Sequence, residues 1–119
     1  MNAEEYSERG RNYFYEKNFD GAIADFTEAI RLEPDNPFTY CFRGVSYRNK
    51  GELDMAIADF TEAIRFGPNK FADFYFERGL TYIVKGNNDL AALDIEMAVK
   101  IDPQKNDYRE VREALEGLK

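Results

Sequence analysis

The sequence predicts an all-α solenoid of three helix pairs with one closing helix. Residue types in the segment 40–68 return when the frame moves back by 34 residues, and return again when it moves forward by 35. Apolar residues inside each copy follow helical spacing, and Gly or Pro separates the helices. The recurring positions are Tyr6, Arg9, Gly10, Tyr13, Ala22, Phe26, Ala29 and Pro34; Tyr40, Arg43, Gly44, Tyr47, Ala56, Phe60, Ala63 and Pro68; and Tyr75, Arg78, Gly79, Tyr82, Ala91, Ile95, Ala98 and Pro103.

The first unit is expected to hold one helix over residues 3–16 and a second from about Phe19 to Glu33. Asn18 can cap the second helix, because its side-chain oxygen accepts a hydrogen bond from a free backbone N–H of the first turn. Pro34 ends that helix, since proline disfavours helix in the residue before it. The unit therefore closes before residue 37.

The second and third units repeat this plan, with a loop after residue 66 that holds one extra residue. Gly51 joins the two helices of the second unit, and Gly86 joins those of the third. The repeats span about residues 3–36, 37–71 and 72–105, with later helices near Pro37–Lys50, Leu53–Phe66, Phe71–Lys85 and Asn88–Ile101.

Residues 106–119 are predicted as a solitary helix. Its narrow apolar stripe is Tyr108, Val111, Leu115 and Leu118, on an otherwise charged surface. A stack of helix pairs needs its last open face covered by an element that is polar outside. We therefore expect a capping helix and one domain over residues 1–119.

Composition excludes several functions. Lys and Arg number 16 against 23 Asp and Glu, a net charge of −7, so we expect no nucleic-acid and no membrane partner. The chain has no histidine and one cysteine, Cys41, which removes His-based catalysis and any internal disulfide. No secretion signal or membrane-length apolar run is present, and we expect a cytoplasmic, non-catalytic protein with no cofactor and no metal.

The repeated positions resemble the tetratricopeptide repeat, over residues 3 to about 105. The resemblance implies a right-handed superhelix whose concave side is formed by the first helix of each pair. The small residues Gly10, Gly44 and Gly79 stand where two helices of a pair cross most closely. The chain departs from the family pattern in one respect above all: an arginine replaces the usual leucine before each of these glycines.

Each of these arginines has an aspartate 16 residues further along, on the second helix of its pair. A charge that faces the core is expensive unless it is paired. We expect three structural ion pairs; the alternative is that the arginines face the groove and bind an anionic ligand. The pairs are Arg9–Asp25, Arg43–Asp59 and Arg78–Asp94.

A second stripe on each first helix is free to face a ligand in the concave groove. It forms an apolar, aromatic floor, with Arg11, Arg48 and Asn49 as hydrogen-bonding guides at its rim. Such a surface suits an apolar peptide or an amphipathic helix of a partner protein. The expected groove residues are Arg11, Phe14, Tyr15, Phe38, Cys41, Phe42, Val45, Arg48, Asn49, Phe76, Leu80 and Ile83.

Two other interpretations of the apolar surface stay open. The chain could form a homodimer or scaffold through the groove or the last repeat, where Leu90, Leu93 and Met97 make one helix apolar on both sides. Part of the stripe could also be ordinary packing between repeats. A hydrolase built on paired carboxylates is disfavoured, because no histidine, phosphate-binding glycine loop or metal-spaced cluster accompanies them.

Some members of the family grip the C-terminal carboxylates of heat-shock chaperones with a clamp of Lys, Asn and Arg side chains. The matching positions here are Ser7, Arg11, Phe42, Asp73 and Glu77. Only one of them is basic and two are acidic. The resemblance therefore implies protein binding but not recognition of an acidic C-terminus.

Overall fold

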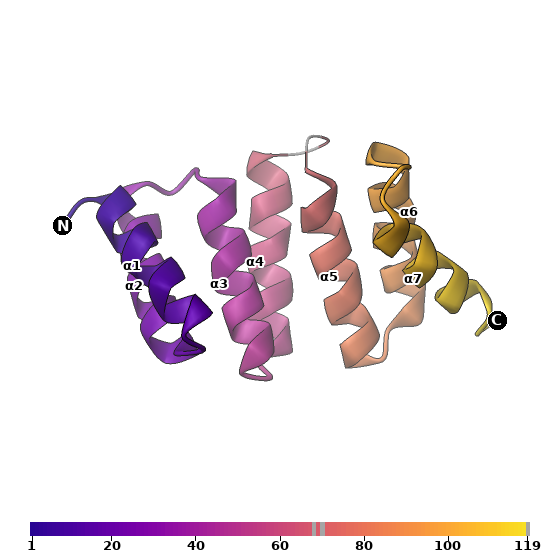
Figure 1. The fold of residues 1–119 in the computed structure, drawn as a ribbon, viewed down its shortest axis with the longest axis horizontal. Coiled ribbons are helices and arrows are strands. Elements are labelled where there is room, and N and C mark those ends of the chain that lie inside the picture. The colour runs from indigo at the N-terminus through magenta and orange to yellow at the C-terminus, as the bar shows by residue number, and fades with distance from the viewer. Residues whose placement is uncertain (68, 70, 119) are drawn as a thin grey trace.

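Seven helices make up the computed structural model, which describes residues 1–67, 69 and 71–118 (Figure 1). Every regular element in these residues is a helix, so the predicted all-α repeat fold is confirmed. None of these helices is both long enough and apolar enough to cross a lipid bilayer. The helices are α1 Ala3–Tyr15, α2 Phe19–Leu32, α3 Pro37–Asn49, α4 Leu53–Phe66, α5 Ala72–Lys85, α6 Asn88–Ile101 and α7 Asn106–Glu116.

The helices pack as three antiparallel pairs that follow one another along the long axis of the molecule, which measures 48 Å against 27 and 20 Å across (Figure 1). The first helices α1, α3 and α5 touch their neighbours in the row, while α2 packs on α3 and α4 on α5. Helix α7 packs on α6 and covers the last pair. The first helices therefore share one face.

Asparagines begin several of the helices. The side chains of Asn2, Asn18, Asn36 and Asn87 each accept a hydrogen bond from a backbone N–H in the first turn. The turns inside the pairs use left-handed backbone at Gly51 (φ 81°) and Gly86 (φ 91°). These two turns can therefore close tightly without strain.

The core of each pair forms where its glycine lies against the side chain of the second helix. A methyl group added to Gly44 would come within 2.8 Å of the Phe60 ring, and one added to Gly10 within 2.7 Å of Phe26. Both rings are fully buried. The glycines are therefore required by the closeness of the two helices.

Several helix bounds differ from the expected ones: α1, α2 and α3 each end one residue earlier, α5 begins one residue later, and α7 ends three residues earlier. Helix α7 ends at Glu116, before Gly117, and Leu118 is 69% exposed, so the stripe that packs is Tyr108, Val111 and Leu115. Phe71 precedes α5 as its N-terminal cap residue and is not its first helical residue. The predicted stop at Pro68 lies outside the described residues.

Candidate functional site

Each of the three arginines forms two hydrogen bonds to its aspartate, at 2.7–2.9 Å from Nε and Nη2. The aspartate side chains are buried, at 5–7% exposure. Arg43 and Arg78 also donate from Nη1 to Thr27 and Thr61 of the preceding pair, at 3.2 Å. The guanidinium groups therefore link helices and repeats, and they do not point into the groove as anion ligands.

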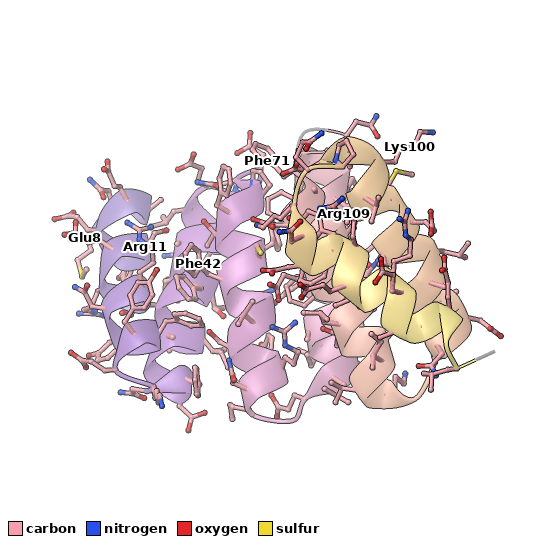
Figure 2. The ribbon with its side chains drawn as sticks, turned by 45° about the vertical axis from the view of Figure 1, so that its right-hand side comes forward. Glu8, Arg11, Phe42, Phe71, Lys100 and Arg109 are labelled. Atoms are coloured by element: carbon pink, nitrogen blue, oxygen red, sulfur yellow. The ribbon has the colours of Figure 1, made fainter. Side chains whose placement is uncertain are left out.

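A cavity of about 430 Å³ opens on the face formed by the first helices. Helix α1 contributes one ring, α3 forms the middle, and the start of α5 forms the far wall. In Figure 2, Arg11, Phe42 and Phe71 follow one another across this face from α1 to the start of α5. The lining residues are Phe14, Phe38, Cys41, Phe42, Val45, Phe71, Asp73, Phe74, Phe76, Glu77, Lys105 and Asp107.

Aromatic rings meet edge to face across the two junctions of the groove. Between α1 and α3, the ring centroids of Phe14 and Phe42 lie 5.6 Å apart. Between α3 and α5, Phe38 lies 4.9 Å from Phe71 and 5.7 Å from Phe74. Such ring pairs stabilise by roughly 0.5–1.5 kcal/mol beyond the area they bury, so the groove is lined by fixed aromatic surface.

Phe71 and Phe74 were missing from the sequence prediction. Phe71 occupies the N-cap position of α5, where the matching residues of α1 and α3 are the capping asparagines Asn2 and Asn36. It makes no side-chain capping bond. The sequence could have indicated this residue, because Phe71 departs from the repeat pattern. An aromatic ring occupies the position where the first two repeats have a capping asparagine.

Gly67 makes room for this ring. A methyl group on Gly67 would lie 2.9 Å from Cδ2 of Phe71 and 3.3 Å from Cε2 of Phe74. The equivalent residues of the other repeats are Glu33 and Asp102. The α4–α5 connection has thus lost a larger side chain in the place where the two rings pack.

Phe76 belongs to both the groove and the core beneath the capping helix. Its ring centroid lies 4.6 Å from that of Tyr108 on α7. The buried Tyr108 hydroxyl donates to the Asp73 carboxylate. A polar replacement at Phe76 would therefore disturb the packing of α7 as well as any ligand.

Two other members of the expected floor do not line the cavity. Ile83 packs against the buried cluster of Ala91, Ile95 and Leu115, so it joins α5 to α6 and α7. Leu80 is half-buried on α5 beyond the cavity wall. Ile83 therefore serves packing at the last pair, which the helical spacing alone did not distinguish from a ligand surface.

The polar guides expected at the rim are placed differently from the prediction. Arg48 lies between α3 and α5, where its Nη2 is 2.6 Å from Glu77 Oε2 and its Nη1 donates to the Glu77 carbonyl oxygen and Thr81 Oγ1. Asn49 is exposed and donates to the Val45 carbonyl oxygen. Arg48 therefore ties two first helices together and is not free to guide a ligand.

At the α1 end, the predicted residues split between the cavity and its surroundings. Phe14 lines the cavity, whereas Arg11 and Tyr15 lie outside the lining. Tyr15 is 71% exposed, with its ring 5.3 Å from Phe14. The six predicted residues that the cavity brings together are Phe14, Phe38, Cys41, Phe42, Val45 and Phe76.

The floor of the groove is a low-polarity environment with negative charge nearby. Burial, together with the carboxylates of Glu77 and Asp73, raises the pKa of the Cys41 thiol to about 12. A thiol with so high a pKa is a poor nucleophile at neutral pH. In the described part of the chain, no group of three or more Cys, Asp or Glu side chains is placed to hold a metal ion. The apolar lining of the groove favours the burial of apolar groups.

Comparison with known proteins found a family and a set of similar folds. The Tetratricopeptide repeat family matches residues 3–36 and again residues 43–106. The first TPR of Spaghetti (RPAP3), bound to the HSP90 peptide SRMEEVD, is 21% identical with a TM-score of 0.93 over 98% of this chain and 91% of that chain. The comparison with curated protein sequences found no match.

Two further solved structures have the same fold. The Arabidopsis OM64 TPR domain is 26% identical, with a TM-score of 0.89 over 95% of this chain and 93% of that chain. The TPR2B domain of yeast Sti1, in its pHsp70 complex, is 23% identical, with a TM-score of 0.90 over 98% of both chains.

Proposed function

Because the chain belongs to the tetratricopeptide repeat family, we propose that it is a non-catalytic module that binds an apolar segment of a partner protein in its concave groove. The RPAP3 domain is seen with an HSP90 peptide and the Sti1 domain in a pHsp70 complex, which supports protein or peptide binding as the type of function. A cytoplasmic location is part of the proposal and rests on the single unpaired cysteine.

One observation carries the proposal: six of the twelve residues that line the concave cavity are phenylalanine, and one of them, Phe38, is 47% exposed. A contiguous exposed apolar surface on a monomer usually marks an interaction site. The first repeat shows that the fold does not require it, since Glu4 stands where α3 has Phe38. Phe38 packs in part against Phe71 and Phe74, and the exposed part of its ring is the surface that we propose a ligand covers.

The test is peptide binding with a variant of the groove and a matched variant outside it. The probe is an array of short blocked peptides with apolar cores, followed by calorimetry on those that bind. Burying an aromatic side chain stabilises by roughly 1.5–3 kcal/mol, so Phe38→Ser should weaken binding about 10- to 100-fold. Circular dichroism should show that the helices remain.

Met55→Ser is the control, because Met55 is 50% exposed on α4 and takes no part in the cavity. The Met55→Ser protein should bind the apolar peptides with the same affinity as the unaltered protein. Equal binding by the Phe38→Ser protein would show that the groove is not the binding surface. Failure of every apolar peptide to bind would reject the proposal itself.

Self-association is a second candidate, favoured by the outer face of α6. Leu93 is 68% exposed and Leu90 is 41% exposed. Met97 takes the place of Glu62, which on α4 pairs with Arg65 at 2.8 Å. If α6 forms a dimer, sedimentation should show an association that Leu93→Glu abolishes and Phe38→Ser leaves intact.

A further inference from the structure

The charged groups around the groove are gathered at its α5–α7 end. Three carboxylates line the cavity there, from Asp73, Glu77 and Asp107, against one lysine, Lys105. The remainder of the lining is apolar. A ligand that fills the cavity therefore meets an apolar floor and a negative edge.

Two of the carboxylates already have partners. Glu77 pairs with Arg48 at 2.6 Å, and Asp73 is contacted by Lys105 Nζ at 3.2 Å and by the Tyr108 hydroxyl. Asp107 is different: among the described residues, no Lys or Arg forms an ion pair with it. It is exposed in the first turn of α7. The edge therefore keeps one carboxylate that a ligand can reach.

The negative charges of Asp73 and Glu77 also act on Cys41 in the floor of the groove. Glu77 and Asp73 act in the same direction as burial on the Cys41 thiol, whose pKa rises to about 12. Nearby negative charge disfavours a thiolate in the way it would disfavour a bound anion. The same carboxylates would stabilise a positive charge that a ligand carries beside its apolar group.

Resting on the binding function proposed above, we infer that the partner segment carries a lysine or arginine next to its apolar side chains and places that cation against Asp107 at the α5–α7 end of the groove. Complementary charge at the edge of an apolar interface sets which partners are accepted more than it sets total affinity. The same carboxylates disfavour a partner that ends in acidic residues.

The experiment uses three versions of each apolar peptide that the array selects. The peptides are blocked at both ends and carry Lys, Gln or Glu beside the same apolar core. For the unaltered protein, the Lys version should bind about threefold more tightly than the Gln version, and the Glu version about threefold more weakly, since exposed ion pairs are individually modest. The difference should shrink as salt is added.

Two pairs of variants locate the contact. Asp107→Lys should remove the preference for the Lys peptide and reverse it, and Asp107→Asn should remove most of it. Glu110→Lys and Glu110→Gln are the controls, because Glu110 is exposed on the same helix, lies outside the lining and changes net charge equally. These controls should keep the preference.

The outcomes separate the two proposals. Equal affinity for the three peptide versions, or equal effects of Asp107 and Glu110 variants, would overturn the inference and leave apolar binding standing. Tighter binding of the Glu version would overturn it as well. If none of the peptides binds, the proposed function fails and the inference fails with it.

Discussion

The junction between α1 and α3 and the junction between α3 and α5 have the same helix geometry but different surfaces. At the first, α3 begins with Asn36 as a capping residue and Thr39 is buried. At the second, the corresponding positions hold Phe71 and Phe74. Phe71 makes no capping bond, although such a bond stabilises a helix by roughly 0.5–2 kcal/mol. The second junction thus lacks this capping contact and instead packs Phe74, which is 3% exposed, and the half-buried Phe71 against Phe38.

By contrast, the contacts inside each pair hardly vary. The Arg–Asp bonds are 2.7–2.9 Å long in all three copies. The glycine at each crossing meets Phe26, Phe60 or Ile95 of the second helix. Positions that repeat therefore build the fold, and positions where one copy departs from the others include those that we propose contact a ligand.

The largest expected effect concerns how far the α3–α5 junction excludes water from the Cys41 thiol. With its pKa raised from about 9 to about 12, the Cys41 thiol should react roughly a thousandfold more slowly with iodoacetamide at pH 8 than in the unfolded chain, since each pKa unit is a factor of ten. The rate should keep rising with pH above 9. Because the folded pKa is the higher one, stability is full below pH 9 and falls as pH rises beyond it.

Ser7→Cys in a Cys41→Ser background is the matched thiol, because Ser7 holds the equivalent position on α1. A thiol there lies away from Asp73 and Glu77, and its alkylation should level off near the ordinary pKa. If both thiols show the same profile with pH, the two junctions are equally accessible to water and the contrast between them is lost.

The second prediction compares ion pairs that differ in burial. Removing one partner of a buried pair leaves the other uncompensated and costs roughly 3–5 kcal/mol. Arg43 is 17% exposed beside Asp59, whereas Arg9 is 49% exposed beside Asp25. Asp59→Ala should therefore lower the free energy of unfolding by about 3 kcal/mol, and Asp25→Ala should lower it clearly less, in urea titrations followed by circular dichroism. Equal losses would show that solvent exposure of the arginine does not set the cost.

Much of the fold was predictable because the residues that each helix pair requires recur in all three repeats. A glycine, an arginine and an aspartate at fixed offsets predicted the helix crossings before any coordinates. The end of α7 was mistaken because a single copy offers no such check: Leu118 continued the apolar stripe, but the helix stops before Gly117.

The candidate site was predictable only in part, for a physical reason. Helical spacing tells which face a residue occupies, but it does not tell whether a neighbouring helix covers that face. Ile83 faced the right way and was covered by the α6–α7 cluster. Arg48 was expected at the rim but forms an ion pair with Glu77 on α5, a partner 29 residues away in sequence.

The smallest expected change in stability concerns Phe71, where a helix-capping side chain is absent and aromatic contacts are present. Phe71→Asn restores the residue that caps α1 and α3, which should recover about 1 kcal/mol of helix stability. The loss of the ring contacts with Phe38 and Phe74, together with the apolar area that the half-buried ring covers, acts in the opposite direction by about 1–2 kcal/mol. The free energy of unfolding should therefore stay within about 1 kcal/mol of the unaltered protein, while affinity for apolar peptides falls about tenfold.

Asn36→Ala is the counterpart at the other junction. It removes a capping bond of 3.0 Å to the Phe38 N–H, and it should cost about 1 kcal/mol of stability with little change in peptide affinity. A loss above about 2 kcal/mol in Phe71→Asn would mean that the ring is core and not binding surface. Since peptide affinity falls at one junction and stability at the other, urea titration and calorimetry on the same two proteins distinguish a ligand surface from a structural one.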